Sequence, residues 1–312
     1  MNKKKNDLEL FGIIGNVKSI EEKTYYIVKK FGEIKKGRLK ASYLTSYNEN
    51  GYILNYISQS KNLYVKNINR YDSEGNLIEQ NLYNLDGSLD YRSTYKYDLN
   101  GNLIEYHHNE LKGNYRMKIN YKYDSIGNRI GEYFYNSDGI LEREHIFKYN
   151  SKGKEIEFYS YSNGHLNTKS ICTYDLNGNL IENNYYDSKG NLCRKHTNTY
   201  DSKGNRIEHN DYNSKGNIEE NIIYDSKGNF IEWNNYNSKG NLYLKKTFKH
   251  NVKGDIIEKY SYSPNENLCD SETCEYEFDE KNNWTKNIIL KKKRGSKIII
   301  RKITYYGKTQ DE

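Results

Sequence analysis

Proline and long apolar runs are almost absent from this sequence. Its 312 residues contain one proline, Pro264, and the mean hydropathy is −1.08. No apolar run of about 20 residues is present, which excludes a membrane-spanning helix. The first five residues resemble the start of a signal peptide, but Asn6-Asp7-Leu8-Glu9 stands where its apolar core is required. We therefore expect a cytoplasmic protein without membrane insertion; the alternative is an exported protein whose leader has been removed.

Cysteine and catalytic motifs are scarce as well. Cys172, Cys193, Cys269 and Cys274 form no Cys-x-x-Cys pair and no spacing typical of a disulfide framework. Reduced thiols in a cytoplasm fit this pattern best. Gly-x-Ser-x-Gly elbows, phosphate loops and zinc signatures are missing. The sequence therefore predicts no enzymatic activity, no cofactor and no metal ion.

A tandem repeat dominates what the sequence does contain. Tyr71-Asp72-Ser73-Glu74-Gly75-Asn76-Leu77-Ile78-Glu79 returns nearly unchanged from Tyr97, Tyr123, Tyr174, Tyr200 and Tyr224, and more loosely from Tyr47, Tyr149, His250 and Phe278. Successive copies start 24 to 28 residues apart. A fainter copy lies about twelve residues into each period, so the unit is one turn plus one stretch of strand length. This periodicity predicts an array of β-hairpins in which each unit packs against its neighbours.

The turns have a specific chemistry. Asp187-Ser188-Lys189-Gly190-Asn191 places Asp first and Gly fourth, as do the turns at Asp201 and Asp225. The Asp side chain can accept from the backbone two residues on, and Gly takes the left-handed conformation that closes a type I turn with a bulge. We predict an all-β chain, a long antiparallel meander of roughly twenty strands in a twisted or curled, elongated sheet.

The sequence does not decide which face of the sheet each recurrent side chain occupies. If Tyr71 lies opposite Leu77, the recurrent isoleucine at Ile78 falls on the other side, beside Lys and Thr. Either both faces of the sheet are partly covered, or a bulge changes the register within each repeat.

Both ends of the chain depart from the repeat. Residues 1–46 carry strand-like stretches at 13–14, 17–20 and 24–28, and residues 284–312 read as a final hairpin. Because a repeat array leaves open edges, we predict an N-terminal cap of strands over 1–46, the array over 47–283, and a C-terminal basic capping hairpin over 284–312.

Positive charge is concentrated at these ends. Residues 1–40 have a net charge of +6, residues 284–312 have +7, and residues 41–283 have −6. The candidate partner-binding residues are Lys291, Lys292, Lys293, Arg294, Lys297, Arg301 and Lys302. A lysine-rich turn binds phosphates without reading sequence. It can equally be a soluble hairpin tip or a charged edge that prevents aggregation.

Histidines and a column of glutamates are the remaining groups with chemical potential. His145 and His196 occupy equivalent places two repeats apart, about 19 Å in strand spacings, too far to share a metal ion. The glutamates recur at 79, 105, 157, 182, 208, 232 and 258. So regular a column singles out no catalytic pair, and cross-strand pairing with Lys, Arg or Tyr explains it better.

The segment Thr94-Tyr95-Lys96-Tyr97-Asp98-Leu99-Asn100-Gly101-Asn102-Leu103-Ile104-Glu105 resembles the YD repeat of RHS-type proteins. The resemblance extends over roughly 230 residues. It implies an all-β repeat that forms curled sheets or shells, linked in bacteria to polymorphic toxins, cell-surface contact or carbohydrate binding. The RHS core signature, the self-cleavage site and the toxin domain of the large members are not recognised here.

Two functions follow as hypotheses. The first is a non-enzymatic bacterial interaction protein that binds a protein or nucleoprotein through its Tyr-rich sheet, with RNA contacting the basic ends. One concrete case is an inhibitor of a nucleic-acid-guided nuclease. The alternative is an exported, glycan-binding or toxin-associated adhesion protein, in which Trp233 and the tyrosines stack on sugars.

Overall fold

The computed structural model describes residues 5–307 except 62, 114 and 294. Over these residues the chain forms one short helix and 22 β-strands, and the strands follow one another in an antiparallel meander. The all-β meander predicted from the repeat is therefore confirmed. The chain divides into two compact units, unit 1 with residues 1–117 and 273–312, and unit 2 with residues 118–272.

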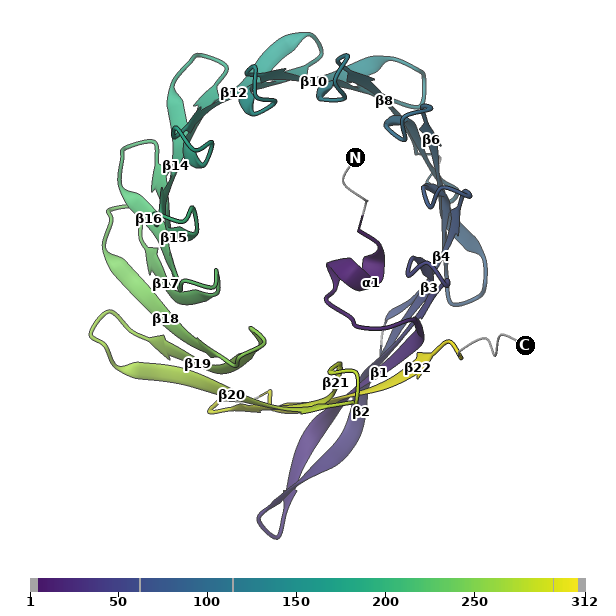
Figure 1. The fold of residues 1–312 in the computed structure, drawn as a ribbon, viewed down its shortest axis with the longest axis vertical. Coiled ribbons are helices and arrows are strands. Elements are labelled where there is room, and N and C mark those ends of the chain that lie inside the picture. The colour runs from purple at the N-terminus through teal and green to yellow at the C-terminus, as the bar shows by residue number, and fades with distance from the viewer. Residues whose placement is uncertain (1–4, 62, 114, 294, 308–312) are drawn as a thin grey trace. The chain divides into compact units, whose positions relative to one another are not determined.

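Unit 1 contains the strands of both chain ends (Figure 1). It comprises α1 (Asp7–Leu10), β1 (Val17–Lys30), β2 (Glu33–Tyr47), β3 (Ile53–Ser60), β4 (Leu63–Tyr71), β5 (Leu77–Tyr83), β6 (Leu89–Tyr97), β7 (Leu103–Glu110), β21 (Trp284–Lys291) and β22 (Lys297–Tyr305). Strands β1 to β7 pair in sequence order, and β21 pairs with β22. In addition β22 pairs with β1, where Ile303 lies opposite Ile20.

Unit 2 is built from repeats. Its strands are β9 (Arg129–Tyr135), β10 (Leu141–Tyr149), β11 (Glu155–Ser162), β12 (His165–Tyr174), β13 (Leu180–Asp187), β14 (Leu192–Tyr200), β15 (Arg206–Asn213), β16 (Ile218–Tyr224), β17 (Phe230–Tyr236), β18 (Leu242–His250) and β19 (Ile256–Tyr262). The unit boundaries fall within β8 (Arg116–Tyr123) and β20 (Leu268–Phe278). From β8 to β19 each strand pairs with the next along the chain.

The pairing of β1 with β22 corrects the expected placement of the chain ends. An open sheet would give residues 1–46 and 284–312 separate edges to cover. Instead β1 has β2 on one side and β22 on the other, so neither the first nor the last strand is a free edge where they pair. The prediction of an elongated, curled sheet with open edges is wrong for this reason, and the two basic ends meet in unit 1.

The segment before β1 also differs from the prediction. Asp7–Leu10 form α1, and Ile13 and Ile14 lie outside any strand. The Asn6 side chain accepts from the Glu9 N–H at 2.9 Å, and the Glu9 carboxylate accepts from the Asn6 N–H at 3.0 Å, which is a capping box. A single helical turn is too short to show a periodicity of 3.6 residues. In the part of the chain that the structure describes, no helix has both the length and the apolar character needed to cross a membrane.

The predicted turn chemistry is confirmed. Gly75 has a φ of +80°, and its N–H donates to the Asp72 carbonyl at 3.2 Å. Tyr71 lies opposite Leu77 while Arg70 lies opposite Glu79, so Ile78 is the extra, bulged residue. Most side chains of β5 are half-buried whichever face they occupy. Both of the alternatives left open by the sequence therefore apply.

The repeated tyrosine has a role that the motif does not reveal. Its hydroxyl donates to a backbone carbonyl about twenty residues earlier, near the start of a strand. The pairs are Tyr97 with Leu77 at 2.8 Å, Tyr149 with Arg129 at 2.8 Å, Tyr174 with Glu155 at 2.6 Å and Tyr200 with Leu180 at 2.9 Å. Each tyrosine thus covers apolar surface with its ring and satisfies an acceptor of the previous repeat with its tip.

Apolar clusters are small. Two are found among the described residues, one of Leu8, Val17, Ile20 and Tyr47, the other of Cys274, Ile289 and Ile299, and both belong to unit 1. Several of the buried side chains of unit 2 are polar, namely Ser160, Ser170, Asn210, Asp211, Asn221 and Asn234. The four cysteines are free thiols.

Candidate interaction surfaces of unit 1

The hairpin of β1 and β2 extends past the strands beside it (Figure 1). Strand β22 pairs with β1 only as far as Tyr26, and β3 pairs with β2 only from Ala41. In the described ladders, residues 27–40 pair only within the β1–β2 hairpin, from Leu39 opposite Tyr25 to Lys30 opposite Glu33 at the tip. We call residues 27–40 the basic arm. A two-stranded ribbon of this kind has no opposing layer in which to bury side chains.

The basic arm combines positive charge with exposed apolar side chains. It contains one acidic residue, Glu33, and six basic residues. The basic residues are Lys29, Lys30, Lys35, Lys36, Arg38 and Lys40. At the tip, Phe31 is 94% exposed and has a φ of +53°. Val28, Ile34 and Leu39 are exposed as well. An exposed apolar patch among basic residues is typical of a binding surface.

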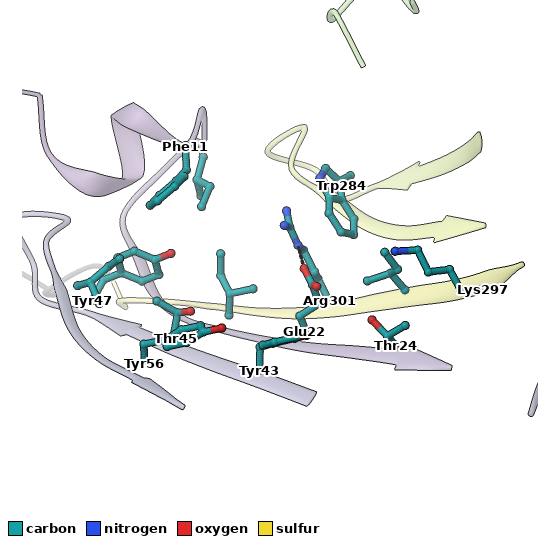
Figure 2. A pocket seen from close by; sticks show the side chains of 14 residues that line it. Phe11, Glu22, Thr24, Tyr43, Thr45, Tyr47, Tyr56, Trp284, Lys297 and Arg301 are labelled. Atoms are coloured by element: carbon teal, nitrogen blue, oxygen red, sulfur yellow. Dashed lines mark hydrogen bonds and ion pairs between the residues drawn. The ribbon is translucent and has the colours of Figure 1, made fainter. Parts of the chain in front are cut away.

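A second surface lies at the base of this hairpin. A pocket of about 510 Å³ opens between β22, β1, β2, β3 and the segment after α1. Its aromatic lining consists of Phe11, Tyr43, Tyr47, Tyr56 and Trp284, and its charged lining of Glu22, Lys297 and Arg301. Figure 2 shows Phe11 and Trp284 on one side of the pocket and the strand tyrosines on the other. We call it the aromatic pocket.

Arg301 is held in place within the aromatic pocket. It lies opposite Glu22 across the β1–β22 ladder, and its Nε donates to the Glu22 carboxylate at 2.9 Å. Its guanidinium carbon is 3.4 Å from the centre of the Trp284 ring, a stacked cation–π contact (Figure 2). Lys297, four residues earlier on the same face of β22, adds a second positive charge. The pocket therefore offers flat aromatic surface together with a net positive charge.

The wall that carries Phe11 is fixed at both ends. Before it, the Ile53 N–H donates to the Asp7 carboxylate at 2.7 Å. After it, the Asn283 side chain accepts from the Ile14 N–H at 2.8 Å and donates to the Ile14 carbonyl at 2.7 Å. On the opposite wall, burial raises the pKa of Tyr47 to about 12, so this phenol stays neutral at physiological pH.

The predicted partner-binding residues do not form one site. Lys297 and Arg301 line the aromatic pocket. Lys292 and Lys293 are exposed in the turn between β21 and β22, and Lys291 is half-buried at the end of β21. Lys302 is exposed and points away from the face that Arg301 occupies, because neighbouring residues alternate along a strand. Arg294 lies outside the described residues.

Sequence reasoning missed the basic arm and most of the aromatic pocket. In the sequence, the lysines of the arm were counted only in the net charge of residues 1–40. The position of Phe31 among these lysines could have indicated a binding surface, and the structure shows this side chain exposed. The pocket joins side chains from both ends of the chain, and only the β1–β22 pairing brings Glu22 to Arg301.

The glutamate column forms the predicted cross-strand ladder. Glu232 contacts Lys245 at 2.7 Å, Glu258 contacts Lys249 at 2.7 Å, and Glu157 contacts Lys148 at 2.9 Å and accepts from Tyr159 at 2.6 Å. Glu79 with Arg70, Glu105 with Lys96 and Glu182 with Lys195 follow the same pattern. These six glutamates thus have cationic cross-strand partners, whereas Glu208 accepts a hydrogen bond from Asn221.

Comparisons with known proteins give little guidance. No protein-family model matches the chain, and no curated protein matches it by sequence. Among solved structures, TcdB2-TccC3 without its hypervariable C-terminal region is 13% identical with a TM-score of 0.33, over 87% of this chain and 16% of that chain. Complete TcdB2-TccC3 is 14% identical with a TM-score of 0.33, over 86% of this chain and 17% of that one.

A porin-like protein from Bacteroides uniformis is 9% identical with a TM-score of 0.33, over 92% of this chain and 98% of that one. This chain thus spans only a small part of the two toxin-complex chains, 16% and 17%. At these scores the similarities do not indicate a function. The candidate surfaces are therefore judged on their own geometry and charge.

Proposed function

We propose that this chain is a non-enzymatic interaction protein that binds a nucleoprotein partner, with the basic arm contacting the nucleic acid. The observation that carries the proposal is the protruding ribbon of residues 27–40, which has six cationic residues along its length and an almost fully exposed Phe31 at its tip. Lysine and arginine contacts to phosphates give most of non-specific affinity, and an exposed aromatic ring stacks on unpaired bases. The YD-type repeat would then serve as the frame that holds the arm.

The other basic groups of unit 1 support the same proposal. Lys292 and Lys293 are exposed in the neighbouring hairpin turn, and Lys297 leads from this turn into the aromatic pocket. The aromatic pocket would receive an aromatic or anionic group of the protein component. A nucleic-acid-guided nuclease is one nucleoprotein of this kind, and the chain would act as its inhibitor by covering the nucleic acid. The proposal places the protein in a bacterial cytoplasm.

The test is direct binding to a labelled single-stranded RNA, followed by fluorescence anisotropy at several salt concentrations. Replacing Lys29, Lys30, Lys35 and Lys36 by Ala removes four charges from the arm. Each lost phosphate contact should reduce the slope of log K against log salt by about 0.7. We also expect Phe31→Ala to weaken binding about 5- to 150-fold, the equivalent of about 1–3 kcal/mol for one stacked base.

A matched control removes the same number of charges elsewhere. Lys152, Lys189, Lys203 and Lys227 are exposed in repeat turns of unit 2, and their fourfold Ala variant should bind RNA with little change. Lys292→Ala with Lys293→Ala tests the C-terminal turn separately. If the arm variant binds RNA at low salt as tightly as the unchanged protein, the arm is not the nucleic-acid surface and the proposal fails.

Glycan binding by an exported protein is the second candidate, and the aromatic pocket favours it. Five aromatic side chains around about 510 Å³ are suited to stacking on sugar rings. A glycan-array screen should then show a ligand whose binding is lost in Trp284→Ala and kept in the arm variant. The opposite pattern, RNA binding lost in the arm variant alone, would exclude this candidate.

A further inference from the structure

Two histidines and a buried aspartate converge on one face of unit 2. They come from neighbouring strands, where His196 of β14 lies opposite Asp211 of β15 and Asn198 lies opposite His209. His196 Nδ1 is 2.9 Å and His209 Nε2 is 3.0 Å from the same oxygen, Asp211 Oδ1. Asp211 is only 3% exposed. The three ligand atoms all lie within 4.8 Å of one another.

The hydrogen bonds around His209 fix the position of its proton. Asn198 Nδ2 donates to the Leu180 carbonyl at 3.0 Å, so the amide oxygen of Asn198 points toward His209. That oxygen is 2.9 Å from His209 Nδ1 and can only accept, so Nδ1 carries a hydrogen. In a neutral imidazole the other nitrogen, Nε2, then has a lone pair. This lone pair is directed toward the Asp211 carboxylate, an arrangement that needs a cation between them.

The oxygen at the centre of the cluster has no hydrogen bond of its own. Asp211 Oδ1 is buried and accepts no hydrogen bond of adequate geometry, although both ring nitrogens are close to it. The other oxygen, Asp211 Oδ2, accepts a hydrogen bond from Arg194 Nη2 on the neighbouring strand. Oδ1 therefore remains available to a ligand. Glu220, opposite Asp211 on β16, adds negative charge beside the cluster.

We propose that His196 Nδ1, His209 Nε2 and Asp211 Oδ1 bind a divalent zinc ion. Two imidazole nitrogens and one carboxylate oxygen are ligands that Zn²⁺ accepts in a tetrahedral site. With bonds of about 2.0–2.1 Å, tetrahedral ligands lie about 3.3 Å apart. The two nitrogen–oxygen separations of 2.9 and 3.0 Å therefore need to open by only a few tenths of an ångström, and the two ring nitrogens lie within 4.8 Å of each other. A water molecule completes the coordination. Asn198 then acts as the outer partner that orients His209.

His145 provides an internal contrast. It occupies the same place in its repeat as His196, and its Nδ1 is 2.8 Å from the Glu132 carboxylate, with which it forms a regular hydrogen bond. The other Glu132 oxygen contacts Arg129 at 3.0 Å. No second histidine joins this pair among the residues around it that the structure describes. A zinc site therefore requires His209, and His145 is the matched control.

The experiment titrates untagged, metal-free protein with zinc chloride by calorimetry and with cobalt chloride by visible absorption. We expect one equivalent of Zn²⁺ per chain and the intense cobalt bands of a tetrahedral site. His196→Ala and His209→Ala should each lower the affinity by at least about 100-fold, and Asn198→Leu by about 10- to 100-fold. His145→Ala should bind as the unchanged protein does. Circular dichroism establishes that each variant is folded, with His209→Gln as a second variant that keeps the size of the side chain.

Three results would overturn the proposal. The first is the absence of stoichiometric Zn²⁺ binding by the unchanged protein. The second is an equal loss of binding in His145→Ala, which would indicate scattered surface histidines. The third is a nitrogen NMR spectrum in which both nitrogens of His209 stay protonated after Zn²⁺ is added. In that case a proton, and not a metal, joins His209 to Asp211.

Discussion

Unit 1 and unit 2 use the same hairpins but bury different chemistry. In unit 1 the buried side chains include the apolar cluster of Val17, Ile20 and Tyr47, covered by Leu8 of α1. In unit 2, Asn221 donates to Asn210 at 2.8 Å and Asn234 donates to Asn221 at 3.0 Å, so buried amides form a chain across β15, β16 and β17. Hydrogen bonds between buried amides therefore link neighbouring strands of unit 2, whereas the joined chain ends of unit 1 bury an apolar cluster.

The largest difference in stability between the two units should follow from a substitution in the apolar cluster of unit 1. Ile20→Ala removes a side chain that is 7% exposed and leaves a cavity against Val17 and Tyr47. We expect a loss of about 2–5 kcal/mol in the free energy of unfolding, measured with urea. Ile222→Ala in β16, where the side chain is half-buried, should cost less. Equal losses at the two sites would contradict the difference between the units.

The amide chain should give an intermediate effect. Asn221→Ala leaves the buried Asn210 side-chain oxygen without this donor, while the Asn234 amino group keeps its hydrogen bond to Glu232. Each unsatisfied buried group costs about 1–3 kcal/mol, so urea unfolding should show a loss of this size. Asn167→Ala, at an exposed position of β12, is the control and should change stability little. A neutral result for Asn221→Ala would mean that water replaces the lost bonds.

The turns of unit 2 should give the smallest effect, a contribution to stability that is present at neutral pH and lost in acid. Hydrogen bonds from the Asn side chain four residues on, and from backbone N–H groups, lower the pKa values of Asp187, Asp201 and Asp225. The folded-state pKa values thus lie below the unfolded value of about 3.9. These carboxylates contribute stability above that pH, and the contribution is lost as the pH falls through the folded-state values.

We expect the triple Asp→Asn variant to be less stable than the unchanged protein at neutral pH and equally stable at about pH 2. Thermal unfolding across this range measures the difference. The turn itself accepts Asn, because Asn213 at the equivalent place accepts from the Asn217 N–H at 3.1 Å. Parallel pH profiles for the two proteins would show that these carboxylates do not contribute.

What could be predicted from the sequence was local. The turn at Asp72, the left-handed Gly75 and the hairpin at the C-terminus follow from short-range chemistry, and the structure has all three. The pairing of β1 with β22 could not be predicted, because Ile20 and Ile303 lie near opposite ends of the chain. The aromatic pocket depends on that pairing and could not be predicted either.

Cross-strand neighbours within the array could not be predicted from the sequence for a different reason. A bulge beside most of the turns shifts the cross-strand partners by one place, as at Tyr224 and Phe230. The amides of Asn210, Asn221 and Asn234 align only once these shifts are known, and so do His196 and Asp211. Counting strands between histidines found His145 and His196 too far apart but did not pair His196 with its neighbour on β15.

The junction of β1 and β22 has a consequence for how the protein is made. Strand β1 leaves the ribosome first and its partner β22 last. At about 5–20 residues per second, β1 waits about 15 to 60 s for that partner during synthesis. Throughout this interval one edge of β1 is an open template on which another nascent chain can assemble. Translation that stalls before residue 297 should therefore yield aggregates, and abundant chaperone should raise the yield of folded protein.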